Sequence, residues 1–183
     1  MSDGAPLRVV VTGSECTGKT TLASRLGARF GAVWVPEFAR SYADAKGAPL
    51  DATDVEPIAR GQRAAEDEGE TRAASLLVLD TDLLSTAVYA RHYYGACPAW
   101  VEEAARSRRA ALYLLCHPDV PWAPDGVRDR GEAREEMHAL FREAVAALVP
   151  FGSRVVDVRG SWREREEEAA RAIRETLAAR PTR

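Results

Sequence analysis

The segment that most constrains this chain is an eight-residue run that matches G-x-x-x-x-G-K-[ST] at every fixed position: Gly13-Ser14-Glu15-Cys16-Thr17-Gly18-Lys19-Thr20. Glycines in such a loop allow backbone angles that bring successive N–H groups around a phosphate, and the helix that follows adds positive charge. An apolar, β-branched run precedes the loop at residues 7–12, and residues 19–30 are expected to form the helix. This context predicts a phosphate-binding loop (P-loop) for a nucleoside triphosphate.

Two side chains of this loop are expected to act directly on the nucleotide. Lys19 would reach the β- and γ-phosphates, and the Thr20 hydroxyl would ligate Mg²⁺. The sequence contains 23 arginines but only two lysines, Lys19 and Lys46, which indicates that position 19 requires a compact ammonium group. We therefore expect ATP and Mg²⁺ as cofactors, with ATP bound by residues Gly13, Ser14, Glu15, Cys16, Thr17, Gly18, Lys19, Thr20 and Thr21.

Apolar runs with strand character alternate with longer helical segments. Strands are expected at 7–12, 32–35, 75–79, 110–116 and 154–158. Helices are expected at 19–30, from the loop at 46–54 to residue 70, at 83–109 with a break between Gly95 and Pro98, at 132–148 and at 164–179. Strands separated by helices predict a parallel sheet covered on both faces, in a single α/β domain that spans residues 1–183.

Polar side chains follow the second and third predicted strands, where open parallel sheets bind their ligands. Asp80 directly ends the third strand, the position of a carboxylate that helps to hold Mg²⁺, although a solvated turn residue is the alternative. Glu37 follows the second strand and could take the proton from an attacking hydroxyl, or could pair with Arg40. We expect Thr20 and Asp80 to be the metal ligands.

The segment after the fourth strand, about residues 117–136, contains several prolines and charged residues and is expected to form a lid. Such a lid could bring Arg128 onto the transferring phosphoryl group, with Arg130 as the second candidate. The predicted catalytic residues are thus Lys19, Glu37, Asp80 and Arg128.

Composition argues against several other classes of protein. No apolar stretch is long enough to cross a bilayer, and no basic segment followed by an apolar one suggests export. Three widely separated cysteines fit reduced thiols in the cytoplasm, and the net charge of −3 offers no basic surface for nucleic acid. The expected partner is a small-molecule substrate, and association into a homo-oligomer is left open.

Several short motifs occur together in one order: the G-x-E-x-x-G-K-[ST] form of the loop, Pro36-Glu37-Phe38-Ala39-Arg40, Gly61-Gln62, Asp80-Thr81-Asp82, Tyr94-Gly95 and Asp125-Gly126-Val127-Arg128. This ordered set resembles the ribosylnicotinamide kinase domain of the bacterial NAD-biosynthesis regulator family over about residues 7 to 165. The resemblance implies a P-loop kinase fold with strand order 2-3-1-4-5. It also implies phosphorylation of the 5′-hydroxyl of nicotinamide riboside by ATP.

Larger members of that family carry a DNA-binding helix-turn-helix and an adenylyltransferase domain ahead of the kinase. Here the first strand begins at Leu7, and His92, His117 and His138 are isolated rather than arranged as the H-x-G-H signature of the adenylyltransferase. We therefore expect neither DNA binding nor adenylyl transfer.

Nicotinamide riboside carries a permanent positive charge on its ring, so its pocket should offer aromatic faces, carboxylates and an amide partner. Candidates beyond strands two and three include Phe38 and Tyr42, although a single aromatic in such a position is more often a packing residue. Gln62 and at least one aromatic are expected to hold the nicotinamide, with Asp82 near the ribose hydroxyls; Asp82 could instead cap a helix. The full predicted acceptor set is Glu37, Arg40, Gln62, Asp82, Tyr89 and Trp100.

Two alternatives remain at this stage. One is a kinase for another nucleoside or small alcohol, which the ATP-binding motifs cannot distinguish. The other is a regulatory P-loop NTPase, but such hydrolases commonly place a glutamate after the metal-binding aspartate, whereas Thr81 follows Asp80 here.

The lysine requirement at position 19 is testable. Lys19→Ala should abolish phosphoryl transfer, and Lys19→Arg should keep the charge yet lose most activity because the guanidinium is larger and planar. Steady-state rates of ADP release would measure both effects. An arginine variant that works at close to the wild-type rate would contradict the requirement.

Overall fold

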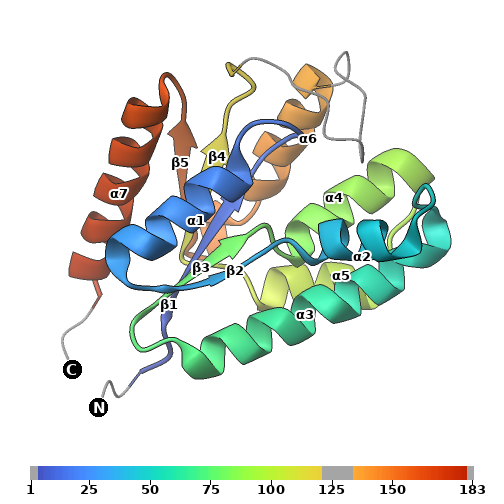
Figure 1. Ribbon diagram of the computed structural model, residues 1–183, viewed down its shortest axis with the longest axis horizontal. Helices are drawn as coiled ribbons and strands as arrows, with labels where there is room; N and C mark the ends of the chain where they lie inside the picture. Colours follow the sequence, from blue (N-terminus) through green and yellow to red (C-terminus); the bar gives the residue numbers. More distant parts are fainter. Residues whose placement is uncertain (1–3, 121–133, 181–183) are drawn as a thin grey trace.

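The computed structural model describes residues 4–120 and 134–180, and its centre is a five-stranded parallel sheet (Figure 1). The strands are β1 (Leu7–Thr12), β2 (Val33–Val35), β3 (Leu76–Asp80), β4 (Leu112–Cys116) and β5 (Arg154–Val158). Their order across the sheet is β2-β3-β1-β4-β5, and every neighbouring pair is parallel. This confirms the predicted fold class and the strand order that the resemblance implied.

Helices cover both faces of the sheet. They are α1 (Lys19–Phe30), α2 (Phe38–Lys46), α3 (Val55–Arg72), α4 (Leu83–Tyr94), α5 (Ala99–Ser107), α6 (Arg134–Ala146) and α7 (Trp162–Ala178), with short 3₁₀ turns η1 (Ala52–Asp54) and η3 (Val149–Phe151). Helices α1 and α7 pack on one face, and α3, α4, α5 and α6 contribute to the core on the other (Figure 1). None of the described helices is long and apolar enough to cross a membrane.

Strand β1 explains why the apolar runs are continuous. Val9 and Val11 belong to the core beneath α1 and α7, whereas Val10, between them, belongs to the opposite core. Because successive side chains of a strand point to opposite faces, the stretch of a strand that is covered on both sides is apolar at consecutive positions. All three valines are fully buried.

The structure departs from the sequence-based elements mainly after β2. Residues 38–46 form helix α2, which the sequence analysis did not predict, and only Ala39 of this helix is buried. A nine-residue helix with so little apolar surface has a weak periodic signal. The predicted break between Gly95 and Pro98 is confirmed, since Gly95 ends α4 with φ 74° and Pro98 is the N-cap of α5.

The packing of α3 on the sheet gives a stability prediction. A Cβ at Gly69 would lie 2.5 Å from Val35 Cγ2 and 3.1 Å from Leu77 Cδ1. Replacing a helical glycine by alanine ordinarily stabilises by about 1 kcal/mol, but overpacking costs about 1–3 kcal/mol. We expect Gly69→Ala to lower the free energy of unfolding in urea, and the Val35→Ala background to relieve part of that loss. Equal or higher stability of the single variant would contradict this account of the helix–sheet contact.

Candidate active site

The phosphate loop joins β1 to α1, and two of its glycines are required by close contacts. Gly13 has φ 133°, and a Cβ there would lie 2.6 Å from the Cys116 carbonyl oxygen of β4. Gly18 has φ 81°, and its Cβ would lie 2.3 Å from the ring of Trp162. The left-handed φ and the missing space both exclude a side chain at these positions.

Carbonyl oxygens of the loop are bound by side chains from three directions. Lys19 Nζ donates to the Ser14 carbonyl at 2.7 Å, Arg134 donates to that of Cys16 at 3.3 Å, and Arg165 donates to that of Thr17 at 3.0 Å. Carbonyl oxygens held in this way cannot turn toward a bound anion. The loop can therefore present its N–H groups to a phosphate, and the Ser14 carbonyl holds the ammonium group of Lys19 within the loop.

The predicted metal ligands lie together. Asp80 is buried, and the nearby Thr20 hydroxyl lowers its pKa, as do Lys19 and Arg40. Burial is the largest influence and, with the neighbouring Glu37 charge, it raises the Asp80 pKa to about 6. Within the described residues, neither carboxylate oxygen of Asp80 has a hydrogen-bond partner of good geometry. A buried carboxylate with two such oxygens beside a hydroxyl fits an oxygen-ligated divalent cation, so Thr20 and Asp80 could hold Mg²⁺ with water and phosphate as further ligands.

The backbone at Thr81 separates the two aspartates of the Asp80-Thr81-Asp82 motif. Thr81 adopts φ 66°, an uncommon left-handed conformation for a threonine, and its N–H donates to the Val11 carbonyl at 3.0 Å. Asp82 then caps α4 by accepting from the N–H groups of Leu84 and Ser85, and its other oxygen accepts from the Tyr113 hydroxyl at 2.9 Å. Asp82 is buried and is not among the residues that line the pocket described below, and its position is that of a helix cap, the alternative considered above.

Glu37 stands where the sequence analysis expected it, close to Asp80 at the carboxyl end of β2. It occupies the N-cap position of α2, yet its carboxylate makes no capping hydrogen bond in the described structure. It is half-buried, and it lines a pocket beyond β2 and β3. Arg40, one turn later, is exposed and near enough to lower the Asp80 pKa.

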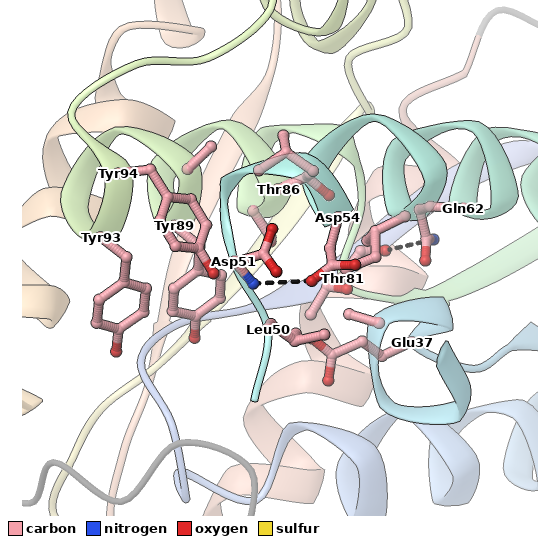
Figure 2. A pocket seen from close by; sticks show the side chains of 15 residues that line it. Glu37, Leu50, Asp51, Asp54, Gln62, Thr81, Thr86, Tyr89, Tyr93 and Tyr94 are labelled. Atoms are coloured by element: carbon pink, nitrogen blue, oxygen red, sulfur yellow. Dashed lines mark hydrogen bonds between the residues drawn. The ribbon is translucent and has the colours of Figure 1, made fainter. Parts of the chain in front are cut away.

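Figure 2 shows this pocket, which lies between α2, η1, α3 and α4. Three tyrosines of α4, Tyr89, Tyr93 and Tyr94, line one end, and Glu37 and Gln62 lie toward the other (Figure 2). The rings of Tyr89 and Tyr93 are parallel, with centroids 6.0 Å apart. Tyr89 was expected here, whereas Tyr93 and Tyr94 were missed, although tyrosines four residues apart share one helix face.

Tyr93 also connects this pocket to the phosphate loop. Its hydroxyl donates to Glu15 Oε1 at 2.7 Å, and the Glu15 side chain is buried. The part of the loop around Glu15 therefore faces the pocket, and the carboxylate of a residue predicted to bind ATP is turned toward α4.

Two aspartates that the sequence analysis did not single out, Asp51 and Asp54, also line the pocket. They form a capping box at η1, in which the Asp51 N–H donates to Asp54 Oδ2 at 2.8 Å (Figure 2). Hydrogen bonds from Thr53 and then Lys46 lower the Asp51 pKa to about 2, and Lys46 also lowers the pKa of Asp54. The Tyr42 hydroxyl donates to Asp54 at 2.9 Å. Tyr42, which the sequence analysis named as a candidate aromatic of the pocket, therefore helps to hold this pair of aspartates.

Gln62 lines the pocket, but its amide is already engaged by the protein. Its Oε1 accepts from the Phe38 N–H at 3.0 Å, and its Nε2 lies 3.3 Å from Glu66 Oε1 and 3.5 Å from the Thr81 carbonyl oxygen. Gln62 thus ties the start of α2 to the turn after β3. Phe38 contributes its backbone to this bond.

The remaining predicted site residues lie elsewhere. Trp100 packs under the Arg60 guanidinium, 5.0 Å from the ring centroid, and is not among the residues that line the pocket. Thr21 is exposed on the first turn of α1. Arg128 and Arg130 lie outside the described residues, as does most of the predicted lid.

Comparison with known proteins agrees with this geometry. A family model described as an AAA domain matches residues 8–165, most of the chain. The chain is 28% identical over 141 residues to the trifunctional NAD biosynthesis/regulator protein NadR of Escherichia coli, covering 74% of this chain and 34% of that protein. NadR of Salmonella typhimurium is 27% identical over 129 residues, covering 68% and 32%. The chain thus spans about a third of these relatives.

Solved structures show the same relationship. The crystal structure of NadR protein in complex with NR has a TM-score of 0.72 and 28% identity, covering 97% of this chain and 53% of that one. NadR protein in complex with NAD and AMP-PNP has a TM-score of 0.70 and 27% identity, covering 97% and 51%. Thymidylate kinase from Ehrlichia chaffeensis has a TM-score of 0.64 at 13% identity over 94% and 99%, a likeness of fold alone.

The geometry predicts different consequences for the two carboxylates. Asp80→Asn should weaken the Mg²⁺ dependence of nucleotide binding and lower the rate, because it removes charge beside Thr20. Glu37→Gln should leave ATP affinity nearly unchanged and lower kcat by about a hundredfold if Glu37 is the base. Titration of ATP at several Mg²⁺ concentrations, with turnover measured in parallel, separates these roles. Equal losses of nucleotide affinity in both variants would contradict them.

Proposed function

Because this chain belongs to the P-loop family described as the AAA domain, we propose that it transfers the γ-phosphoryl group of ATP to the 5′-hydroxyl of nicotinamide riboside. The products would be nicotinamide mononucleotide and ADP. The observation that carries the proposal is the pocket beside Asp80, which combines three tyrosines with three carboxylates.

The donor half of the reaction is supported by the phosphate loop. Its N–H groups and Lys19 would bind the β- and γ-phosphates, with the start of α1 adding favourable charge. Mg²⁺ held through Thr20 and Asp80 would supply positive charge that offsets the charge of the phosphates. These interactions serve any P-loop kinase, so they do not select the acceptor.

The acceptor half is supported by the charge of the pocket. Glu37, Asp51 and Asp54 contribute carboxylates, and none of the described lining residues is a lysine or an arginine. Lys46 offsets part of this charge from outside the lining, through its contacts with Asp51 and Asp54. A cationic pyridinium ring gains from carboxylates nearby and from the faces of tyrosine rings.

The position of Glu37 suits the base. It lines the pocket and lies near enough to Asp80 to raise the pKa of that carboxyl, so an acceptor hydroxyl in the pocket could contact Glu37 close to the phosphates. Removing the hydroxyl proton as the bond to phosphorus forms is the step that this carboxylate would assist. Arg40 is placed near the same charges and would help to bind the phosphates.

The homology supports the same acceptor, since a NadR protein has been solved in complex with NR. Gln62 is proposed as a positioning residue that orients Glu37 through α2, because its amide already binds the first N–H of that helix.

A matched set of acceptors tests the charge argument. Nicotinamide riboside should be phosphorylated with a kcat/KM about tenfold or more above that of its 1,4-dihydro form, which is neutral but nearly identical in shape. Uridine and thymidine should be poorer still. ADP release with ATP and Mg²⁺ would be measured for each acceptor side by side.

Other results would redirect the assignment. Equal efficiency with the dihydro form would remove the role of ring charge, and equal efficiency with uridine or thymidine would leave only a nucleoside kinase. Rapid ATP hydrolysis without any acceptor would favour a regulatory NTPase instead.

A further inference from the structure

Two buried arginines contact the phosphate loop, and they differ in how their charge is compensated. Arg165 of α7 is fully buried and forms an ion pair with the Asp119 carboxylate. Its guanidinium also donates to the carbonyl oxygens of Thr17, Gly160 and His117. A buried cation with a carboxylate and several carbonyl oxygens is a complete structural brace.

Arg134, the first residue of α6, has no such compensation from the described residues 4–120 and 134–180. It is 9% exposed, and among the described residues its guanidinium donates to the carbonyl oxygens of Cys16 and Val120, at 3.3 to 3.4 Å. Its Nε is buried without an acceptor. In the part of the chain that the structure describes, no carboxylate forms an ion pair with it.

A buried guanidinium with no counter-ion is costly, and the contacts that Arg134 makes are longer than those of a typical charge-assisted hydrogen bond. Replacing these carbonyl contacts by contacts to a bound anion would therefore be favourable. The planar fork of an arginine matches the oxygens of a phosphate better than those of isolated carbonyls.

The position of Arg134 indicates which phosphate is within reach. It contacts the loop at Cys16, next to Glu15, which binds Tyr93 at the wall of the acceptor pocket. The phosphoryl group that is transferred must lie on this side of the loop, between the nucleotide and the acceptor. The α-phosphate and the nucleoside would then lie farther from the pocket.

We propose that Arg134 binds the terminal phosphoryl group of the nucleoside triphosphate and exchanges its contact with the Cys16 carbonyl for that group. This inference rests on the proposed use of ATP but not on the identity of the acceptor. Arg134 would be an additional catalytic residue, present in the described structure and distinct from Arg128 and Arg130.

The test compares two nucleotides that differ only beyond the β-phosphate. Affinities of AMP-PNP and ADP for the full chain would be measured by calorimetry with Mg²⁺, for the wild type, Arg134→Lys and Arg134→Met. Arg134→Met should weaken AMP-PNP binding at least tenfold and change ADP binding less than twofold. Arg134→Lys should lie between, because it keeps the charge but loses the fork. Arg142→Met, an exposed arginine of the same helix, is the matched control and should change neither affinity.

Each other outcome has a distinct meaning. Equal losses for ADP and AMP-PNP would overturn the proposal and make Arg134 a brace of the loop like Arg165, and unchanged affinities would exclude any contact. If Arg134→Met does not fold, the Arg134→Lys ratio of AMP-PNP to ADP affinity decides the question, with the melting temperature as the check on folding. Wild-type protein that binds neither nucleotide would overturn the proposed function together with this inference.

Discussion

Strand β1 is hydrogen-bonded along both edges and covered by an apolar layer on both faces, so its carboxyl end is held in one position. The register with β3 pairs Val11 with Asp80, which places the proposed metal-binding carboxylate beside the residues that begin the phosphate loop. Strand β2 follows on the outer edge of β3 and ends just before Glu37. The order 2-3-1 thus sets the candidate base, the candidate metal ligand and the phosphate loop side by side, and each depends on the pairing of β1.

Contacts from distant parts of the chain hold the loop from outside the sheet. Arg165 lies 148 residues after Thr17 and binds its carbonyl, together with segments that follow β4 and β5. Tyr93 of α4, which lines the pocket, binds Glu15 from that side. Any shift of α4 or α7 would therefore be transmitted to the loop. The geometry of a local eight-residue motif is in this way a property of the whole domain.

Features with a local cause could be predicted from the sequence, and features with a distant cause could not. Short-range sequence patterns predict the loop, the strands and the break at Gly95. The position of Asp80 beside the loop is predicted by its place at the end of an apolar run. Helix α2 depends on Gln62, 24 residues away, which accepts the first N–H of the helix. Asp82 was expected near the ribose, but the Tyr113 hydroxyl and the N–H groups of α4 occupy its oxygens. The place of Asp51 and Asp54 in the pocket could not be predicted either, because it depends on the folding of η1.

The distribution of charge in the site also limits the kind of acceptor. Lys19, Arg134 and Arg165 gather around the phosphate loop, whereas the described lining of the proposed acceptor pocket carries three carboxylates and no lysine or arginine. A nucleoside monophosphate would bring about two negative charges toward these carboxylates, and like charges in a partly buried site repel strongly. A neutral acceptor avoids that repulsion, and a cationic one turns it into attraction. The fold is shared with a thymidylate kinase, but the charge of this pocket supports the proposal that a nucleoside, rather than a nucleotide, receives the phosphate.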